Sequence, residues 1–180
     1  MVAFLLVALL LAPQVSPDKS NGRNWRPAVF HGLVVGKSRR TEVLRRLGQP
    51  KWSRTHEGNE RDRDDRETFN HYESGGEFPG SLTVVLNKKG IVTRADFFPS
   101  KLSRDEAVAH FGAGYTVTRY AIEPCGGDED AETLYESANG PLTYVEYRGR
   151  GIAIAIGYQN MVTKISYVSG PIGRSKSRCE

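Results

Sequence analysis

The stretch that decides the fold reads Ile152-Ala-Ile-Ala-Ile-Gly-Tyr-Gln-Asn-Met-Val-Thr-Lys-Ile-Ser-Tyr-Val168. It contains an apolar strand, a short turn made of residues that tolerate turn conformations, and a second strand. An earlier stretch, Leu82-Thr-Val-Val-Leu-Asn-Lys-Lys-Gly-Ile-Val-Thr-Arg-Ala-Asp-Phe-Phe98, aligns with it without a gap at an offset of 152 − 82 = 70. The chain is therefore predicted to form two similar β-hairpins.

A short helix is expected ahead of each hairpin. Residues 38–48 and 103–112 share a serine at the N-cap position, an apolar stripe and a closing glycine. In the second segment, Ser103 and Glu106 have the spacing of a capping box. Additional strand-like stretches cover residues 68–72, 116–122 and 142–147. The predicted fold class is α+β, with two tandem repeats that each pack one or two short helices on a three- to four-stranded antiparallel β-meander.

The chain divides into four predicted segments. Residues 1–20 are predicted to form a signal peptide, because the apolar run from Val2 to Ala12 is too short to cross a bilayer as a helix. Its cleavage site is undefined. An uncleaved anchor or a misplaced start codon is the alternative. Residues 29–98 and 99–169 form the two repeats, and residues 170–180 form a basic C-terminal tail. No cysteine lies near the end of the apolar run, where a lipoprotein would carry its lipid acceptor, so we expect an exported protein, periplasmic or secreted, that is not lipid-anchored.

The composition is that of an ordinary globular protein, with 26% charged residues and a net charge of +4. A charge of this size does not by itself indicate nucleic acid, and no nucleic-acid partner is expected. Positive charge concentrates around the first helix, where Arg39, Arg40, Arg45 and Arg46 could contact an anionic envelope surface. The alternative is that these arginines form the solvated side of an amphipathic helix.

The two cysteines, Cys125 and Cys179, are candidates for a disulfide. An even pair in an oxidising compartment favours pairing, which would tie the C-terminal tail to the body of the protein. Two unpaired thiols are the alternative, and the spacing of the cysteines shows no metal-site pattern.

Alternation along the hairpins indicates which residues are available to a partner. Ile152, Ile154 and Ile156 should pack against the helix, which leaves the residues between them on the opposite face. The same reasoning on the neighbouring strands, together with the frequent use of aromatic residues in interfaces, defines a candidate partner-binding set. Its members are Thr83, Val85, Arg94, Asp96, Tyr144, Ala153, Ala155 and Lys164.

No motif in the chain indicates catalysis, a cofactor or a metal. The segment from Gly32 to Ser38 is similar to a P-loop, but it has three residues between its glycines instead of four, so nucleotide binding is not expected. The histidines lack metal-ligand spacing, and no serine or cysteine has a recognisable base beside it. We therefore expect no enzyme activity. The least favoured alternative is a small hydrolase that uses His71, Glu73 or the acidic loop at 128–130.

The first half of the chain resembles a known family. Gly36-Lys-Ser, a short helix, Leu47-Gly48-Gln-Pro50 and a terminal hairpin together resemble the SmpA/OmlA (BamE-like) domain of outer-membrane-assembly lipoproteins. The doubled unit is similar in arrangement to the β-lactamase inhibitory proteins. The lipid-acceptor cysteine of the lipoproteins is absent. The resemblance implies a non-catalytic, extracytoplasmic, protein-binding module.

These features together predict a non-catalytic exported protein-binding or scaffolding module of the bacterial cell envelope. The alternative is a secreted proteinaceous enzyme inhibitor, which would block an enzyme cleft with the open faces of both sheets. The expected partner is a protein, and no cofactor is expected.

Overall fold

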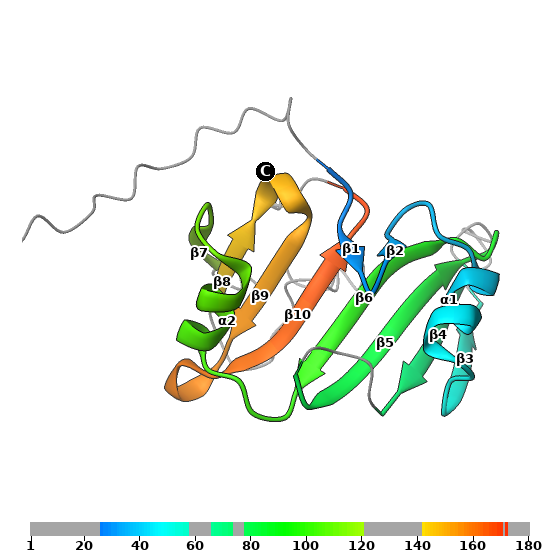
Figure 1. Ribbon diagram of the computed structural model, residues 1–180, viewed down its shortest axis with the longest axis horizontal. Helices are drawn as coiled ribbons and strands as arrows, with labels where there is room; N and C mark the ends of the chain where they lie inside the picture. Colours follow the sequence, from blue (N-terminus) through cyan, green and yellow to red (C-terminus); the bar gives the residue numbers. More distant parts are fainter. Residues whose placement is uncertain (1–25, 58–65, 74–77, 121–141, 171, 173–180) are drawn as a thin grey trace, which may run out of the picture.

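The computed structural model describes residues 26–57, 66–73, 78–120, 142–170 and 172 (Figure 1). The predicted signal peptide, the acidic loop at 128–130 and both cysteines lie outside the described residues. The elements are β1 (Val29–Phe30), β2 (Leu33–Val34), α1 (Arg40–Leu47), β3 (Trp52–His56), β4 (Glu67–Tyr72), β5 (Gly80–Asn87), β6 (Val92–Pro99), α2 (Arg104–Phe111), β7 (Thr116–Tyr120), β8 (Leu142–Tyr147), β9 (Ile152–Ile156) and β10 (Val162–Val168), with short 3-10 turns at Arg148–Arg150 and Tyr158–Asn160.

Eight of the strands form one antiparallel sheet in the order β3-β4-β5-β6-β10-β9-β8-β7. The strands β3 to β6 run inward as a meander from one edge, and β7 to β10 run inward from the other edge. The last strands of the two meanders, β6 and β10, pair at the centre of the sheet. In this central pair Phe97 lies opposite Ile165, and Ala95 lies opposite Tyr167. The two hairpins are therefore adjacent parts of a single sheet.

The predicted α+β fold class with two tandem repeats is wrong. In the described residues only two helices of eight residues each accompany ten strands, and the large sheet is continuous. The reason lies in the β6–β10 pairing, because each inner strand uses the other to satisfy its backbone hydrogen-bonding groups instead of leaving an exposed edge. The fold is mostly β, with an eight-stranded sheet and a small two-stranded sheet formed by β1 and β2.

Both predicted hairpins are present. The strand β5 pairs with β6, and β9 pairs with β10. The registers place Thr83 opposite Asp96 and Ala153 opposite Ser166. Each pair shares one face of the sheet, as the alternation in the sequence required.

The helix α1 begins one residue later than the sequence predicted. The residue at its N-cap is Arg39, not Ser38, and the Arg39 backbone N–H donates to the Glu42 carboxylate at 3.0 Å. Ser38 is buried, and its hydroxyl accepts a hydrogen bond from the backbone N–H of Val34 at 3.1 Å. Ser38 therefore closes the turn that leads into α1 and does not cap the helix itself.

The predicted capping box of α2 is confirmed. The Ser103 hydroxyl accepts from the Glu106 backbone N–H at 3.2 Å, and the Glu106 carboxylate accepts from the Ser103 backbone N–H at 2.8 Å. The helix ends at Gly112, whose φ of 82° lies in the region that only glycine adopts readily. These local signals fix both ends of a helix that has only eight residues.

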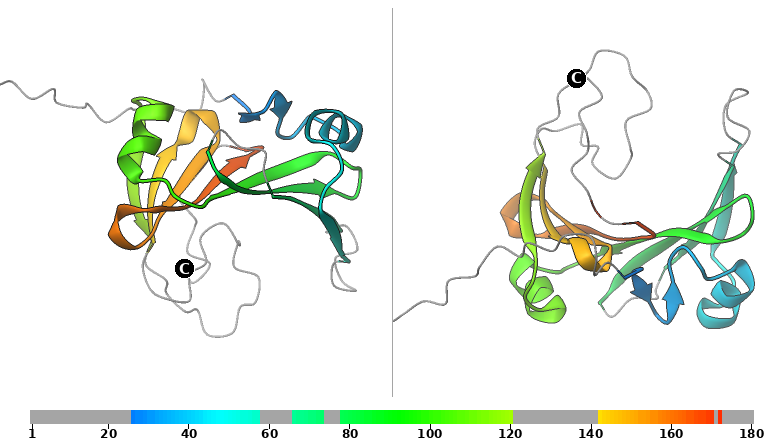
Figure 2. Two further views of the ribbon diagram at one scale, coloured as in Figure 1. Left: turned by 60° about the horizontal axis from the view of Figure 1, so that its bottom comes forward. Right: turned by 90° about the horizontal axis from the view of Figure 1, so that it is seen from above.

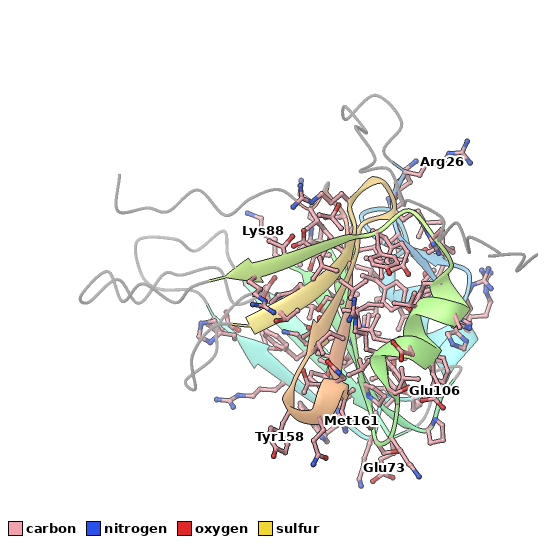
Figure 3. All side chains as sticks on the ribbon, turned by 90° about the vertical axis from the view of Figure 1, so that its left-hand side faces the viewer. Arg26, Glu73, Lys88, Glu106, Tyr158 and Met161 are labelled. Atoms are coloured by element: carbon pink, nitrogen blue, oxygen red, sulfur yellow. The ribbon has the colours of Figure 1, made fainter. Side chains whose placement is uncertain are left out.

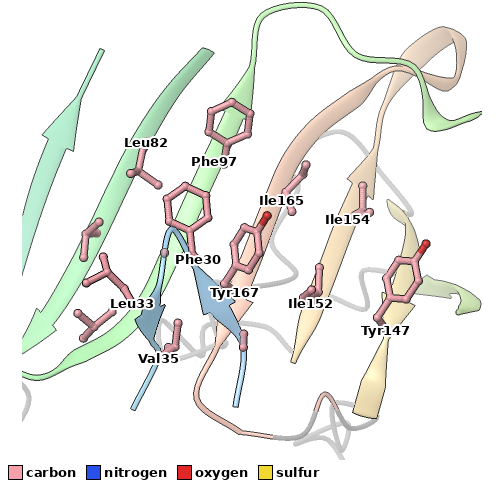
Figure 4. Close-up of a cluster of buried hydrophobic side chains, with 14 of the residues drawn as sticks. Phe30, Leu33, Val35, Leu82, Phe97, Tyr147, Ile152, Ile154, Ile165 and Tyr167 are labelled. Atoms are coloured by element: carbon pink, nitrogen blue, oxygen red, sulfur yellow. The ribbon is translucent and has the colours of Figure 1, made fainter. Parts of the chain in front are cut away.

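The two helices and the β1–β2 hairpin cover one face of the sheet, on the outer side of its curvature (Figure 2). The hairpin turns at His31 and Gly32, whose positive φ values of 47° and 73° are those of a type I′ turn. Phe30 and Leu33 of the hairpin pack with Phe97 in the core between the helices and the sheet (Figure 4). The hairpin thus fills the space that the two short helices leave uncovered.

The isoleucines of β9 lie in this core, as the alternation predicted. Ile152, Ile154 and Ile156 are buried with Ala107 of α2 in the same cluster. At the far end of β9, Tyr158 projects from the turn before β10 (Figure 3).

Candidate functional site

The sheet face turned away from α1, α2 and the β1–β2 hairpin is the candidate functional surface, which we name the open face. It is the inner side of the curved sheet in Figure 2. One row of residues crosses it from edge to edge, with one residue from each of the eight strands. The row consists of Trp52, His71, Thr83, Asp96, Ser166, Ala153, Glu146 and Thr116.

A polar cluster occupies the middle of the row. Asp96 and Ser166 are buried, and the Ser166 hydroxyl donates to Oδ1 of Asp96 at 2.7 Å. Nε of Arg94 donates to Oδ2 of the same carboxylate at 2.8 Å. Because both carboxylate oxygens accept a hydrogen bond, the negative charge of Asp96 is compensated within the sheet. This arrangement fixes the junction of β6 and β10 and does not present a reactive acid.

A second buried carboxylate lies on β8. Glu146 is 0% exposed, and its Oε2 accepts from Nε of Arg148 at 3.0 Å and from the Thr118 hydroxyl at 3.0 Å. The guanidinium of Arg148 also donates to the Thr118 hydroxyl at 3.2 Å. The three side chains form a closed hydrogen-bonded ring that holds the edge strand β7 against β8.

Aromatic and charged side chains are exposed at the opposite edge of the sheet. The indole of Trp52 is 47% exposed and stacks on the imidazole of His71, with ring centroids 4.8 Å apart and 13° between the planes. Lys51 and Glu73 form an exposed ion pair beside them. The hydrogen bond from Lys51 holds the pKa of Glu73 below its usual value. The imidazole of His71 thus stacks on Trp52, while the carboxylate of Glu73 pairs with Lys51.

The exposed side chains continue from Trp52 along β3. Arg54 is exposed and lies opposite the half-buried Phe69 of β4. We name Trp52, Arg54, Phe69 and His71 the aromatic strip. At the end of β6, Phe98 adds another large apolar side chain to the open face, 40% exposed. Tryptophan and arginine are the residue types that most often dominate binding energy in protein interfaces.

All eight residues of the predicted partner-binding set lie on the open face. They differ in exposure. Thr83, Arg94 and Lys164 are half-buried. The other five members are buried, namely Val85, Asp96, Tyr144, Ala153 and Ala155.

A residue from the C-terminal segment covers part of the set. Ile172 is only 5% exposed and packs with Tyr144, Ala153 and Ala155 in a small apolar cluster. The small side chains of β9 are therefore covered by a residue of the same chain. The part of the open face left with exposed large apolar side chains is the β3–β6 half.

The four arginines near α1 are all exposed. Exposure is expected both for contact with an anionic surface and for the solvated side of an amphipathic helix. Arg45 lies 3.9 Å from the Glu42 carboxylate, and Arg46 donates to the backbone carbonyl of His31 at 3.4 Å. Arg46 is therefore directed toward the β1–β2 hairpin.

Two further observations concern the described residues. No group of three or more histidine, cysteine, aspartate or glutamate side chains in them is placed to hold a metal ion. Within the same part of the chain, neither helix has the length or apolar character needed to cross a membrane.

Sequence reasoning missed the aromatic strip because it missed β3. No strand was predicted between the first helix and residue 68, although Trp52-Ser-Arg-Thr-His56 forms a strand paired with β4. The available signal was the aromatic and β-branched content of these residues beside a predicted strand. Because β3 is an edge strand with five exposed residues, its sequence lacks the apolar alternation of a half-buried strand.

Comparisons with known proteins do not place the chain in a family. No protein family and no curated protein matches its sequence. A solved structure that it resembles is that of a DUF4309 family protein (YjgB) from Bacillus subtilis. The identity is 12%, the TM-score is 0.47, and the match covers 82% of this chain and 89% of the other.

The resemblance to the SmpA/OmlA (BamE-like) domain and to the arrangement of the β-lactamase inhibitory proteins is therefore wrong as an assignment. No family model matches the chain, that of the SmpA/OmlA domain included, and the two predicted repeats are parts of one continuous eight-stranded sheet. The motif that suggested it consists of a turn before a short helix and a glycine and proline after it. Such signals report helix ends, which many unrelated folds share.

Proposed function

We propose that this protein is a non-catalytic, exported module of the bacterial cell envelope that binds a protein partner through the open face. The single observation that carries the proposal is the aromatic strip, in which Trp52 is held on His71 while nearly half of its surface remains exposed. A stacked indole loses little conformational freedom when a partner covers it, and this lowers the entropic cost of binding.

The curvature of the sheet indicates the shape of the partner. The open face lies on the inner side of the curve (Figure 2). A concave surface can enclose a protruding helix or loop, whereas it cannot enter a cleft. This supports a partner with a protruding element. A concave face weighs against an inhibitor that fills an enzyme cleft. The alternative function is an inhibitor that binds around a protruding part of an enzyme.

The proposed envelope location rests on the sequence of residues 1–20, and the four arginines near α1 are a second, electrostatic element of the proposal. They would hold the protein near an anionic surface through the side that carries α1. This side is opposite the open face, so surface contact and partner binding would not compete. Retention in the envelope favours the scaffolding role, and release into the medium favours inhibition.

Site-specific crosslinking in the producing cell tests the proposal. A photoreactive benzophenone amino acid replaces Trp52 in one variant and Tyr158 in a control variant. Tyr158 is also aromatic, is 86% exposed, and lies outside the open face in the β9–β10 turn. The expected result is a discrete protein adduct from position 52 that is absent from position 158.

A second experiment measures the energetic role of the indole. Trp52→Ala should weaken binding of the crosslinked partner by at least about tenfold, as expected for an interface anchor. Tyr158→Ala should leave binding unchanged. Urea unfolding of both variants checks that a loss of binding is not a loss of folding. Equal adducts at both positions, or adducts at neither, would contradict the proposal.

A further inference from the structure

A cavity lies on the other side of the sheet from the open face. It has a volume of about 150 Å³ and is bounded by the β1–β2 hairpin, α2, the start of β9 and the central strands β6 and β10. Its position is independent of the proposed protein-binding surface, because the whole thickness of the sheet separates the two. Segments far apart in the chain meet only in the folded protein to form it.

The inner wall of the cavity is apolar and largely aromatic. Phe97, Ile165 and Tyr167 contribute from the sheet, and these three side chains lie together in the core (Figure 4). Phe30 closes one side and packs on Tyr167 with ring centroids 4.9 Å apart. A volume of about 150 Å³ is large enough to hold one benzene ring. The wall therefore suits a single ring or an apolar group of that size.

The rim of the cavity is cationic. His31, His110 and Arg150 line its mouth, and all three are exposed. None of the described residues that line the cavity is an aspartate or glutamate. The guanidinium of Arg46 lies next to the same rim, where it donates to the His31 carbonyl. The mouth thus combines two permanent positive charges with two imidazoles and no lining carboxylate.

Arg150 is held in position by its own contacts. One guanidinium nitrogen donates to the backbone carbonyl of Phe111 at 2.7 Å, and the guanidinium carbon lies 5.1 Å from the centre of the Tyr147 ring. An arginine has five N–H donors in a planar fork, so this one hydrogen bond leaves further donors for a planar anion. A fixed guanidinium at the mouth of an aromatic cavity is the arrangement that recognises a ring carrying a carboxylate.

We propose that this cavity binds a small carboxylic acid with a single aromatic ring. The ring occupies the cavity, and the carboxylate lies at the rim beside Arg150. The simplest member of this class is benzoate. Its neutral, isosteric counterpart is benzamide, which offers the same ring without the negative charge.

The test is a titration of the full chain with benzoate and, separately, with benzamide at constant ionic strength, followed through backbone amide chemical shifts. Benzoate should shift the amides of Phe30, His31, His110 and Phe111, and should bind at least about tenfold more tightly than benzamide, as expected for a charged hydrogen bond. This comparison uses the unaltered protein and does not depend on the folding of any variant.

Two variants then test the role of the guanidinium. Arg150→Gln should remove the preference for benzoate over benzamide while leaving benzamide binding within about twofold. Arg45→Gln changes the net charge equally, but Arg45 lies on α1 outside the cavity, so it should leave both affinities unchanged. This control separates a local contact from a general effect of charge.

Several results would overturn the inference. Absence of shifts at the cavity amides with either compound would mean that the cavity takes no such ligand. Equal affinity for benzoate and benzamide would eliminate the carboxylate as the recognised group. An equal loss of benzoate binding in Arg45→Gln and Arg150→Gln would exclude a specific contact at the rim.

Discussion

The Ser166 hydroxyl donates a 2.7 Å hydrogen bond to the Asp96 carboxylate, and the two residues hold equivalent places, 166 − 96 = 70 positions apart, in the two aligned hairpins. This bond lies at the β6–β10 pairing, where two consecutive meanders become one sheet. The central junction is therefore joined by side chains as well as by its backbone ladder.

Ser166→Ala should lower the free energy of unfolding by about 1–3 kcal/mol, because it removes a donor from a buried carboxylate. Urea denaturation measures the change. Ser81→Ala, which alters a less buried serine on the neighbouring strand β5, should stay within about 0.5 kcal/mol of the parent. Equal effects of the two substitutions would show that the Ser166 bond does not stabilise the junction.

The capping box of α2 predicts a specific pH dependence. Hydrogen bonds from Ser103 hold the pKa of Glu106 below its ordinary value of 4.5. A carboxyl with a lowered pKa in the folded state stabilises the protein above its unfolded pKa, and this contribution is lost as the pH falls through the folded pKa. Glu106→Gln keeps a side chain that can complete the box but does not titrate.

The difference in the free energy of unfolding between the parent and Glu106→Gln should therefore change below about pH 4.5, in the direction of a loss by the parent. Thermal unfolding at a series of pH values between 3 and 7 would measure it. Parallel curves for the two proteins over this range would mean that Glu106 titrates in the folded state as it does in the unfolded state.

Burial, not side-chain size, should decide the cost of truncation on α1. Val43 is fully buried, whereas Leu47 packs only partly against the core. Val43→Ala should lower stability by about 2 kcal/mol, and Leu47→Ala should cost less although it removes more atoms. Measured in urea, the reverse order would mean that the helix is rotated relative to the sheet.

The hydroxyl of Tyr72 is buried and has no hydrogen-bond partner among the described residues. Burial raises the pKa of Tyr72, and the charge of Arg40 only partly opposes this effect. Tyr72→Phe removes a polar group that loses its water on folding, so it should leave stability unchanged or raise it by about 1 kcal/mol. Destabilisation by more than that in urea would reveal a partner for the hydroxyl.

The contact of Ile172 with the open face is also testable. Ile172→Ala should lower stability by about 2 kcal/mol, since the side chain is buried against Tyr144, Ala153 and Ala155. The amides of β8 and β9 should exchange faster with solvent. Ser169→Ala, at an exposed position in the same segment, provides the control. Unchanged stability and exchange in Ile172→Ala would mean that Ile172 does not cover these strands.

Local features of the fold could be predicted from the sequence. The hairpins and the faces of their residues followed from the alternation, so that residues such as Thr83 and Asp96 were correctly placed on a common face. The capping box of α2 depends on residues three positions apart, a distance at which sequence determines geometry closely. Such predictions succeed because the interacting groups are neighbours in the chain.

The non-local features could not be predicted in the same way. The pairing of β6 with β10 joins distant residues, such as Asp96 and Ser166, which are 70 positions apart, and no turn between them specifies their register. The exposed strand β3 carries no buried stripe, and the aromatic cavity draws its wall from several distant segments. The expectation that Ala153 and Ala155 would meet a partner did not anticipate Ile172, which lies beyond the last strand.

The register at the centre of the sheet has a consequence for symmetry. Phe97 of the first hairpin is equivalent to Tyr167 of the second, and Ala95 is equivalent to Ile165. Because Phe97 pairs with Ile165 and Ala95 pairs with Tyr167, a local twofold axis passes between residues 96 and 166. In a dimer of two identical hairpin chains, the residue on such an axis would face its own copy. Aspartate would then face aspartate, and two buried carboxylates would repel each other. A single covalent chain can place an acid opposite an alcohol on the axis, an asymmetry that identical subunits could not achieve.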